Sequence, residues 1–160
     1  MSTNYYRLNK LAEEVFAVKN DPEQLDVDDS VIRHLVKIHP YTVSEHIENN
    51  ESVAWLLVIP TTEEIMNDFI SGKITEKQLY QMTPLNTEYQ TIYLCSALVL
   101  EEFRSKGITK EMAIRAIQKI QKDHPVKALF TWPFTDEGDK VAEKISDITG
   151  LPLYKRTDRH

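Results

Sequence analysis

The feature that most constrains the fold is a strand–turn–helix unit between residues 91 and 120. Residues 91–100 are apolar and rich in strand formers, and the apolar residues of 108–120 recur at the spacing of one helix face. The turn between them carries Arg104, Lys106 and Gly107. A helix start leaves backbone N–H groups unpaired and adds partial positive charge, so this turn favours a phosphate or pyrophosphate. An ordinary turn with solvated charges is the alternative interpretation.

The rest of the chain alternates predicted strands and helices, which is typical of a single α/β domain spanning residues 1–160. Residues 5–19 predict a helix to Glu13 and then a short strand. The capping-box spacing of Thr42 and Glu45 predicts another short helix, and Pro60 is expected to end the strand before it. We expect further strands at 52–59, 91–100, 126–130 and 151–155, and helices at 30–38, 62–70, 75–82, 108–122 and 135–149. The helix at 75–82 is expected to begin at a capping box of Thr75 and Gln78, and the helix at 135–149 to end at Gly150.

Composition excludes several classes of function. The net charge of −6 argues against a nucleic-acid binder, which normally carries a basic face. A single cysteine excludes an intrachain disulfide and fits a reducing compartment. No apolar stretch approaches membrane-spanning length, and the five histidines have no zinc-site spacing. We therefore expect a cytoplasmic protein with no metal, no membrane segment and no nucleic-acid partner.

The segment Arg104-Ser-Lys-Gly107-Ile-Thr109 resembles the (Arg/Gln)-x-x-Gly-x-(Gly/Ala) signature of the GNAT acyl-CoA N-acyltransferase superfamily. The lead-in Val99-Leu-Glu-Glu-Phe-Arg104 is similar to that family's approach to the signature. Thr109 stands where the family has a small residue, and Glu101 where it has proline. The resemblance covers roughly residues 91–155. It implies a GNAT-like α/β fold, with a mixed, largely antiparallel twisted sheet and helices on both faces.

The same resemblance implies a function. Acetyl-CoA would be the co-substrate, and an acyl group, expected to be acetyl, would pass directly to an amine of a small molecule or peptide. The acidic total charge favours a cationic amine. The resemblance places the pantetheine arm along the backbone of Leu98, Val99 and Leu100. It places the pyrophosphate on the turn formed by Arg104, Ser105, Lys106, Gly107, Ile108 and Thr109.

The catalytic groups are less clearly marked. Many family members carry a glutamate on the strand before the signature, but residues 93–96 read Tyr-Leu-Cys-Ser. Cys95 is a candidate nucleophile, with a small apolar core residue as the alternative. The family's tyrosine that protonates the leaving thiolate aligns with Ser146, so Tyr154 is the candidate substitute, with a surface aromatic as the alternative. Trp132 either borders the acyl pocket or packs in the core.

Two other classes of function stay open. In one of them the chain keeps the cofactor cleft without turnover and acts as a CoA-binding sensor or protein-interaction module. A homodimer also stays open. A small α/β domain that binds a partner protein without CoA is the third reading. The family usually joins its second to fourth strands as a meander, whereas two helices are predicted here between 52–59 and 91–100. We expect that one meander strand is lost or lies at 85–90.

Overall fold

The computed structural model describes residues 29–133 and 135–158. The chain forms an α/β fold with a five-stranded mixed sheet in the order β1-β2-β3-β4-β5. The strands are β1 (Val43–Glu48), β2 (Glu51–Thr61), β3 (Thr91–Val99), β4 (Ala128–Thr131) and β5 (Leu153–Lys155). The helices are α2 (Asp29–Ile38), α3 (Glu63–Ile70), α4 (Glu76–Met82), α5 (Ile108–Asp123) and α6 (Asp136–Thr149), with short 3₁₀ turns at Pro40–Thr42 and Glu101–Phe103.

The two halves of the sheet differ in strand direction. The longer pairings, β1 with β2 and β2 with β3, are antiparallel. The shorter pairings, β3 with β4 and β4 with β5, are parallel, and α5 and α6 form their crossovers. The predicted mixed sheet is confirmed, and its antiparallel part is limited to the first three strands.

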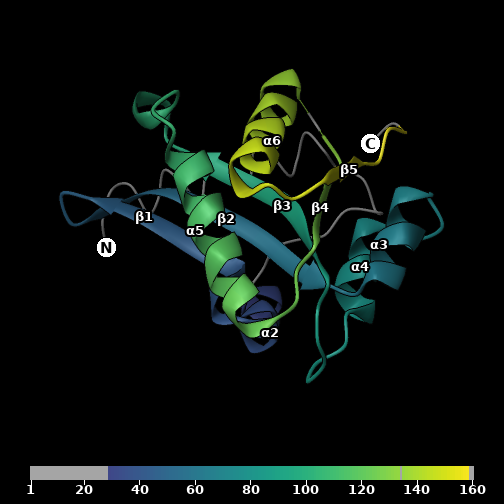
Figure 1. Cartoon of the computed structure of the whole chain (residues 1–160). Helices are drawn as coiled ribbons and strands as arrows, with labels where there is room; N and C mark the ends of the chain where they lie inside the picture. The colour runs from purple at the N-terminus through teal and green to yellow at the C-terminus, as the bar shows by residue number, and fades with distance from the viewer. Residues whose placement is uncertain (1–28, 134, 159–160) are drawn as a thin grey trace.

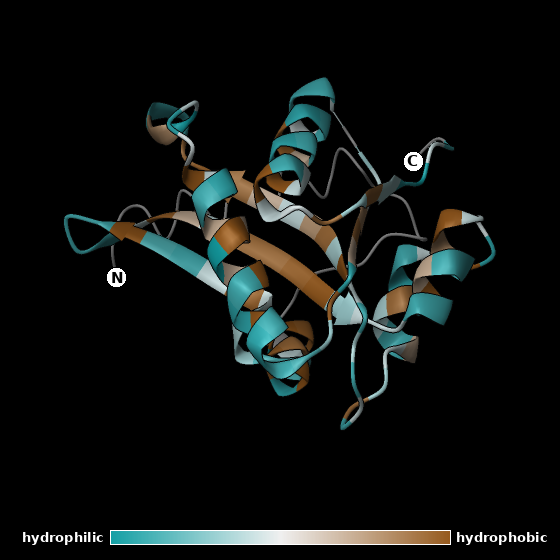
Figure 2. Ribbon diagram, in the orientation of Figure 1, coloured by the Kyte–Doolittle hydropathy of each residue, from teal (hydrophilic) through white to brown (hydrophobic). Residues whose placement is uncertain are grey.

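Helices cover both faces of the sheet, as predicted. Helices α5 and α6 lie on the near face in Figure 1, and α3 and α4 lie together beside the C-terminal end of β2. One apolar core joins α5 and α6 to residues such as Val58 and Ile92, and the other joins α2, α3 and α4 to Ile59 and Tyr93. Because neighbouring strand residues point to opposite faces, a strand buried on both sides reads as a continuous apolar run. Figure 2 shows this run as the brown band along β2.

The helix predicted from Thr42 and Glu45 is wrong, because these residues lead into and form β1. The Thr42 hydroxyl donates to the carbonyl of His39 at 2.8 Å, so it does not act as a helix cap. Asn49 and Asn50 both adopt positive φ, 53° and 63°, which turns the chain straight back into β2. Asparagine tolerates this conformation, and a two-residue turn of this kind favours a hairpin. The strands β1, β2 and β3 pair antiparallel in sequence order, and residues 85–90 contribute no strand, so the prediction of a strand there is wrong.

Most other boundaries agree with the sequence to within two residues. Pro60 does not end β2, which continues to Thr61, and the cap of α3 is Thr62, whose hydroxyl oxygen accepts from the Ile65 N–H. The predicted capping box between Thr75 and Gln78 is confirmed by both of its hydrogen bonds. Gly150 ends α6 at a φ of 74°, as predicted. The helix and strand predicted within residues 5–19 lie outside the described residues.

Candidate functional site

Strand β4 pairs along its whole length with the first residues of β3, which is the longer strand. The last pair in their parallel register is Leu94 with Thr131, and the Thr131 hydroxyl closes it by donating to the Leu94 carbonyl at 3.2 Å. Strand β4 ends there, whereas β3 continues to Val99. Within the described residues, no strand pairs with this side of residues 95–99. A strand edge of this kind presents backbone N–H and C=O groups that another chain-like partner can pair with.

A bulge in β3 lies at the same place. Leu57 of β2 pairs with Ser96 and the next residue, Val58, pairs with Leu94, so Cys95 is an extra residue in β3. Such bulges bend a strand and redirect its side chains, and they are common beside functional sites. The bulge therefore helps to open the sheet where β4 ends.

The opening holds a cavity of about 520 Å³, a size typical of small-molecule sites. Its floor is the part of β3 that extends beyond β4, where Leu98 and Val99 are half-buried and Ala97 is exposed although all are apolar. Its walls come from the turn after β3, from α5 and α6, and from the end of β4. They include Phe103, Arg104, Ser105, Gly107, Ile108, Thr109, Ala113, Trp132, Val141 and Ala142. A set of apolar residues left uncovered in the middle of a sheet is typical of a ligand groove.

The cationic turn forms one end of this cavity. Ser105 and Gly107 both have positive φ, 63° and 77°, so the backbone curls before α5 begins. Gly107 is the N-cap of α5 and supplies no side chain to satisfy the first amides of the helix. The Arg104 Nε donates to the Val99 carbonyl at 3.0 Å, which holds the guanidinium against the strand edge. Positive charge and helix-start amides therefore lie together at the Val99 end of the cavity.

The structure brings most of the residues predicted to bind cofactor to this cavity. Seven of the nine line it: Leu98, Val99, Arg104, Ser105, Gly107, Ile108 and Thr109. Leu100 does not, because it is 3% exposed in the core and its N–H donates to the Val53 carbonyl. Lys106 does not line it either, and its ammonium lies 5.5 Å from the centre of the Phe103 ring.

The two predicted catalytic residues are placed differently. Cys95 lines the cavity at the bulge. Tyr154 is not among the lining residues, because it lies on β5 opposite Phe130 and is 47% exposed. Its role as an acid stays a prediction that this position does not favour. Trp132 packs in the core, where it is 4% exposed, and it also lines the cavity, so that its place beside an acyl group stays a prediction.

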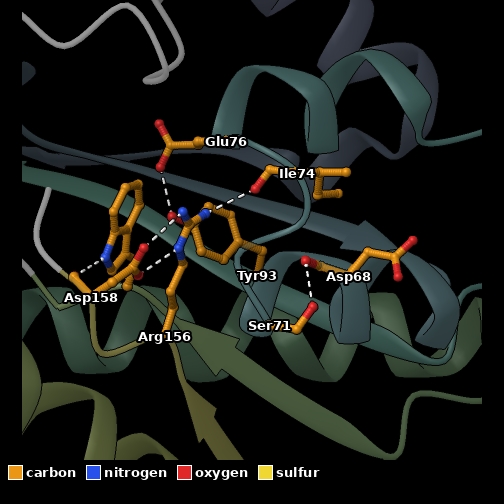
Figure 3. A network of polar contacts seen from close by, with 8 residues as sticks. Asp68, Ser71, Ile74, Glu76, Tyr93, Arg156 and Asp158 are labelled. Carbon is orange, nitrogen blue, oxygen red and sulfur yellow. Dashed lines mark hydrogen bonds and ion pairs between the residues drawn. The ribbon is translucent and has the colours of Figure 1, made fainter.

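A buried carboxylate that the sequence did not single out lines the other end of the cavity. Glu76, the first residue of α4, is 9% exposed, and its Oε2 accepts a hydrogen bond of 2.6 Å from the Tyr93 hydroxyl. Figure 3 shows the two side chains pointing toward each other. Burial, and then the charge of Glu76, raise the pKa of Tyr93 well above its ordinary value, so the phenol stays protonated and remains the donor.

Arg156 organises the surroundings of this pair. Its guanidinium donates to the Ile74 carbonyl at 2.9 Å and to both carboxylate oxygens of Asp158, at 2.7 and 3.0 Å. It also stacks 4.1 Å from the centre of the Trp132 ring. The Trp132 indole N–H in turn donates to the Asp158 carbonyl at 2.8 Å. These contacts tie the loop before α4 to the chain after β5, and so fix where Glu76 stands (Figure 3).

Comparison with known proteins assigns no family. No protein-family model matches the sequence, and no curated protein matches it either. In the described part of the chain, no three histidine, cysteine or acidic side chains are grouped to hold a metal ion. In the same residues, no helix has the length and apolar character needed to cross a membrane.

Proposed function

We propose that this chain is a GNAT-like domain that binds acetyl-CoA and transfers its acetyl group to an amine. The observation that carries the proposal is the cavity beside β3 beyond the end of β4, with the start of α5 at one end of it. A thioester cofactor has an anionic end and a long amide-bearing arm. The cavity offers a cationic turn for the first and, for the second, an edge of β3 with which no described strand pairs.

Each of the two parts of the site would bind a different part of the cofactor. The amides of Gly107, Ile108 and Thr109 and the charge of Arg104 suit a pyrophosphate. The pantetheine amides would then pair with the edge of residues 95–99 as an added strand does. Arg104 would have to release the Val99 carbonyl, which it occupies now, as the arm enters.

The chemistry would be a direct transfer. The amine nitrogen attacks the thioester carbonyl carbon, the C–N bond forms, and the C–S bond breaks. The thiolate leaves, the nitrogen loses one proton, and the thiolate takes up one proton to give the free thiol. The site contributes by holding the thioester and the amine in line, which replaces a bimolecular encounter by a step within one complex. Cys95 forms no intermediate in this scheme.

A non-catalytic sensor is the second candidate, and one observation favours it. The Ser146 hydroxyl, at the position where the family resemblance implies a tyrosine acid, donates to the Leu151 carbonyl at 2.6 Å. It is therefore engaged away from any thiolate. A sensor would bind acetyl-CoA with the same residues and would release no thiol in the presence of amines.

Calorimetric titration with acetyl-CoA tests the shared part of both candidates. We expect saturable binding of one cofactor to each chain. Trp132 lines the cavity, so in a Trp55→Phe variant the remaining tryptophan fluorescence should change along the same binding curve. Release of free thiol on adding an amine panel then separates the enzyme from the sensor. Absence of cofactor binding would contradict both.

A further inference from the structure

We infer that His39 and His124, which join the end of α2 to the end of α5, form a pH-sensitive latch that is closed while both rings are neutral and opens when they take up protons. The latch consists of these two side chains with their partners Tyr41 and Asp123. Its opening releases the turn Pro40–Thr42, which leads into β1. The inference does not depend on the proposed function, because none of these residues lines the cavity beside β3.

His39 is the link between the two helices. It follows α2 directly, it is 5% exposed, and its ring has a different partner on each nitrogen. Nδ1 accepts from the Tyr41 N–H at 3.1 Å, and Nε2 lies 2.7 Å from a carboxylate oxygen of Asp123, the last residue of α5. One imidazole therefore caps the turn Pro40–Thr42 and holds it against the end of α5, which lies beside α2 in Figure 1.

These contacts fix where the His39 ring carries its proton. A ring nitrogen that accepts a hydrogen bond has no proton, and a ring nitrogen that faces a carboxylate donates one. The closed latch therefore holds a neutral His39 with its proton on Nε2. A second proton can go only to Nδ1, where it would face the Tyr41 N–H and remove the acceptor that caps the turn. The attraction of a charged ring to Asp123 opposes this loss only weakly, because the Asp123 side chain is 62% exposed.

His124 is a second ring that resists a proton in the closed latch. It follows α5 directly, and its ring centre lies 6.0 Å from that of His39 and 4.6 Å from that of Tyr89. Its Nδ1 is buried and has no hydrogen-bond partner among the residues that the structure describes. A proton on a buried nitrogen without an acceptor is costly. Burial, and then the charge of His39, lower the pKa of His124, so a proton on either ring disfavours a proton on the other.

The other charged and titratable groups around the two rings come from α5, from the turn and from the segment before β3. These groups are Asp123, Lys119, Tyr41, Glu88 and Tyr89. The two carboxylates act against the pKa shift of His124 without reversing it, and Lys119 adds a further positive charge, 5.9 Å from the centre of the Tyr41 ring. The closed latch therefore takes up protons less readily than an open one, in which both rings are in water. By linkage, acid favours the open form.

Native-state amide hydrogen exchange on the full chain, followed by NMR at pH 7.5 and 5.5, measures the opening. The amides of Tyr41 and Thr42 report on the latch, because they donate to the ring and to the carbonyl of His39. The hydrogen-bonded amides of Leu100 and Leu129, two core residues, report on global unfolding. A histidine that takes a proton only in the open form raises the opening constant about ten-fold over this range, since its ordinary pKa is about 6.5.

After correction for the intrinsic exchange rate, we expect the opening constant at Tyr41 and Thr42 to rise at least about ten-fold at pH 5.5. Low concentrations of urea should leave this opening unchanged and should accelerate exchange at the two core amides, because a local opening exposes little surface. The imidazole nitrogen shifts at pH 7.5 should show a neutral His39 with its proton on Nε2.

A double variant, His39→Asn with His124→Asn, removes both titrating rings. Asparagine is a good N-cap residue and can still accept from the Tyr41 N–H, so the turn should stay capped. Its opening constant should change less than about two-fold between the two pH values, and His124→Asn alone should show an intermediate response. His46→Asn is the matched control, because His46 lies on β1, 3.8 Å from the Glu48 carboxylate, and this variant should keep the full response.

Three results would overturn the inference. Protection at Tyr41 and Thr42 that stays constant or rises at pH 5.5 would show that a charged His39 is held by Asp123. An undiminished response in the double variant would place the proton uptake elsewhere. Exchange at the two latch amides that follows the core amides, with the same dependence on urea, would show that no local opening exists. The expected acid response in a chain that binds no acetyl-CoA would support the latch and contradict only the proposed function.

Discussion

Replacement of Gly107 by valine should remove cofactor binding while leaving the fold in place. Gly107 has a φ of 77° at the start of α5, and a Cβ added there would meet only the Lys110 side chain, at 3.9 Å. The substitution therefore causes no steric clash and acts through backbone strain alone. A β-branched residue held at positive φ costs about 1–3 kcal/mol. The chain can relieve this strain only by rotating the turn, which would redirect the amides of Ile108 and Thr109.

The cost of backbone strain at Gly107 can be compared with the cost at a matched position, Gly150. Gly150 has a φ of 74° at the end of α6, has nothing within 4 Å of an added Cβ, and does not line the cavity. Gly150→Val should therefore carry the same strain. For a domain of this size each kcal/mol lowers Tm by about 2–4 °C, so both variants should melt at similarly reduced temperatures. Loss of even one charge-assisted hydrogen bond to a pyrophosphate should weaken binding about ten-fold or more.

Thermal unfolding and acetyl-CoA calorimetry on the two variants provide the assay. We expect equal losses of stability, with cofactor affinity lost only in Gly107→Val. Retained affinity in Gly107→Val would show that the turn does not hold the cofactor. An equal loss of affinity in Gly150→Val would show that general destabilisation is the cause, and the reasoning from the turn geometry would then be wrong.

Three further outcomes are expected. Arg104→Gln should weaken acetyl-CoA binding several-fold in low salt and less in high salt, because salt screens the lost charge; calorimetry at two ionic strengths checks this. Phe69→Ala should cost about 3–5 kcal/mol in denaturant unfolding, since the ring is fully buried against Tyr93 and Trp132. Burial, and then the charge of His39, lower the pKa of His124 below 6.5. As the pH falls, the unfolded chain therefore protonates His124 before the folded chain does. The contribution of neutral His124 to the free energy of unfolding is complete above pH 6.5 and is lost as the pH falls toward the folded-state pKa. Thermal unfolding across this range should show a smaller loss of stability in a His124→Asn variant than in the unmodified chain.

The sequence alone determined the elements whose signals are local. The periodicity of 108–120, the capping box at Thr75 and the glycine after α6 depend on neighbours a few residues apart, and the structure confirms them. The cationic turn could be predicted for the same reason, because its residues are neighbours in the sequence, and most of them line the cavity. The error at Thr42 arose because a capping pattern and the start of a strand share the same residues, and the pairing of β1 with β2 decided between them.

Only the tertiary structure determines which residues line the end of the cavity opposite the turn at Arg104. The contact between Glu76 and Tyr93 joins residues 17 apart across a helix and a strand, and the contact of Arg156 with Ile74 spans 82 residues. In the sequence Glu76 is simply an acidic residue in the first turn of a helix. Its burial, its partner and its place in the cavity follow from where the sheet opens. That opening depends on a bulge in β3 and on the length of β4, and strand pairing over long separations sets both.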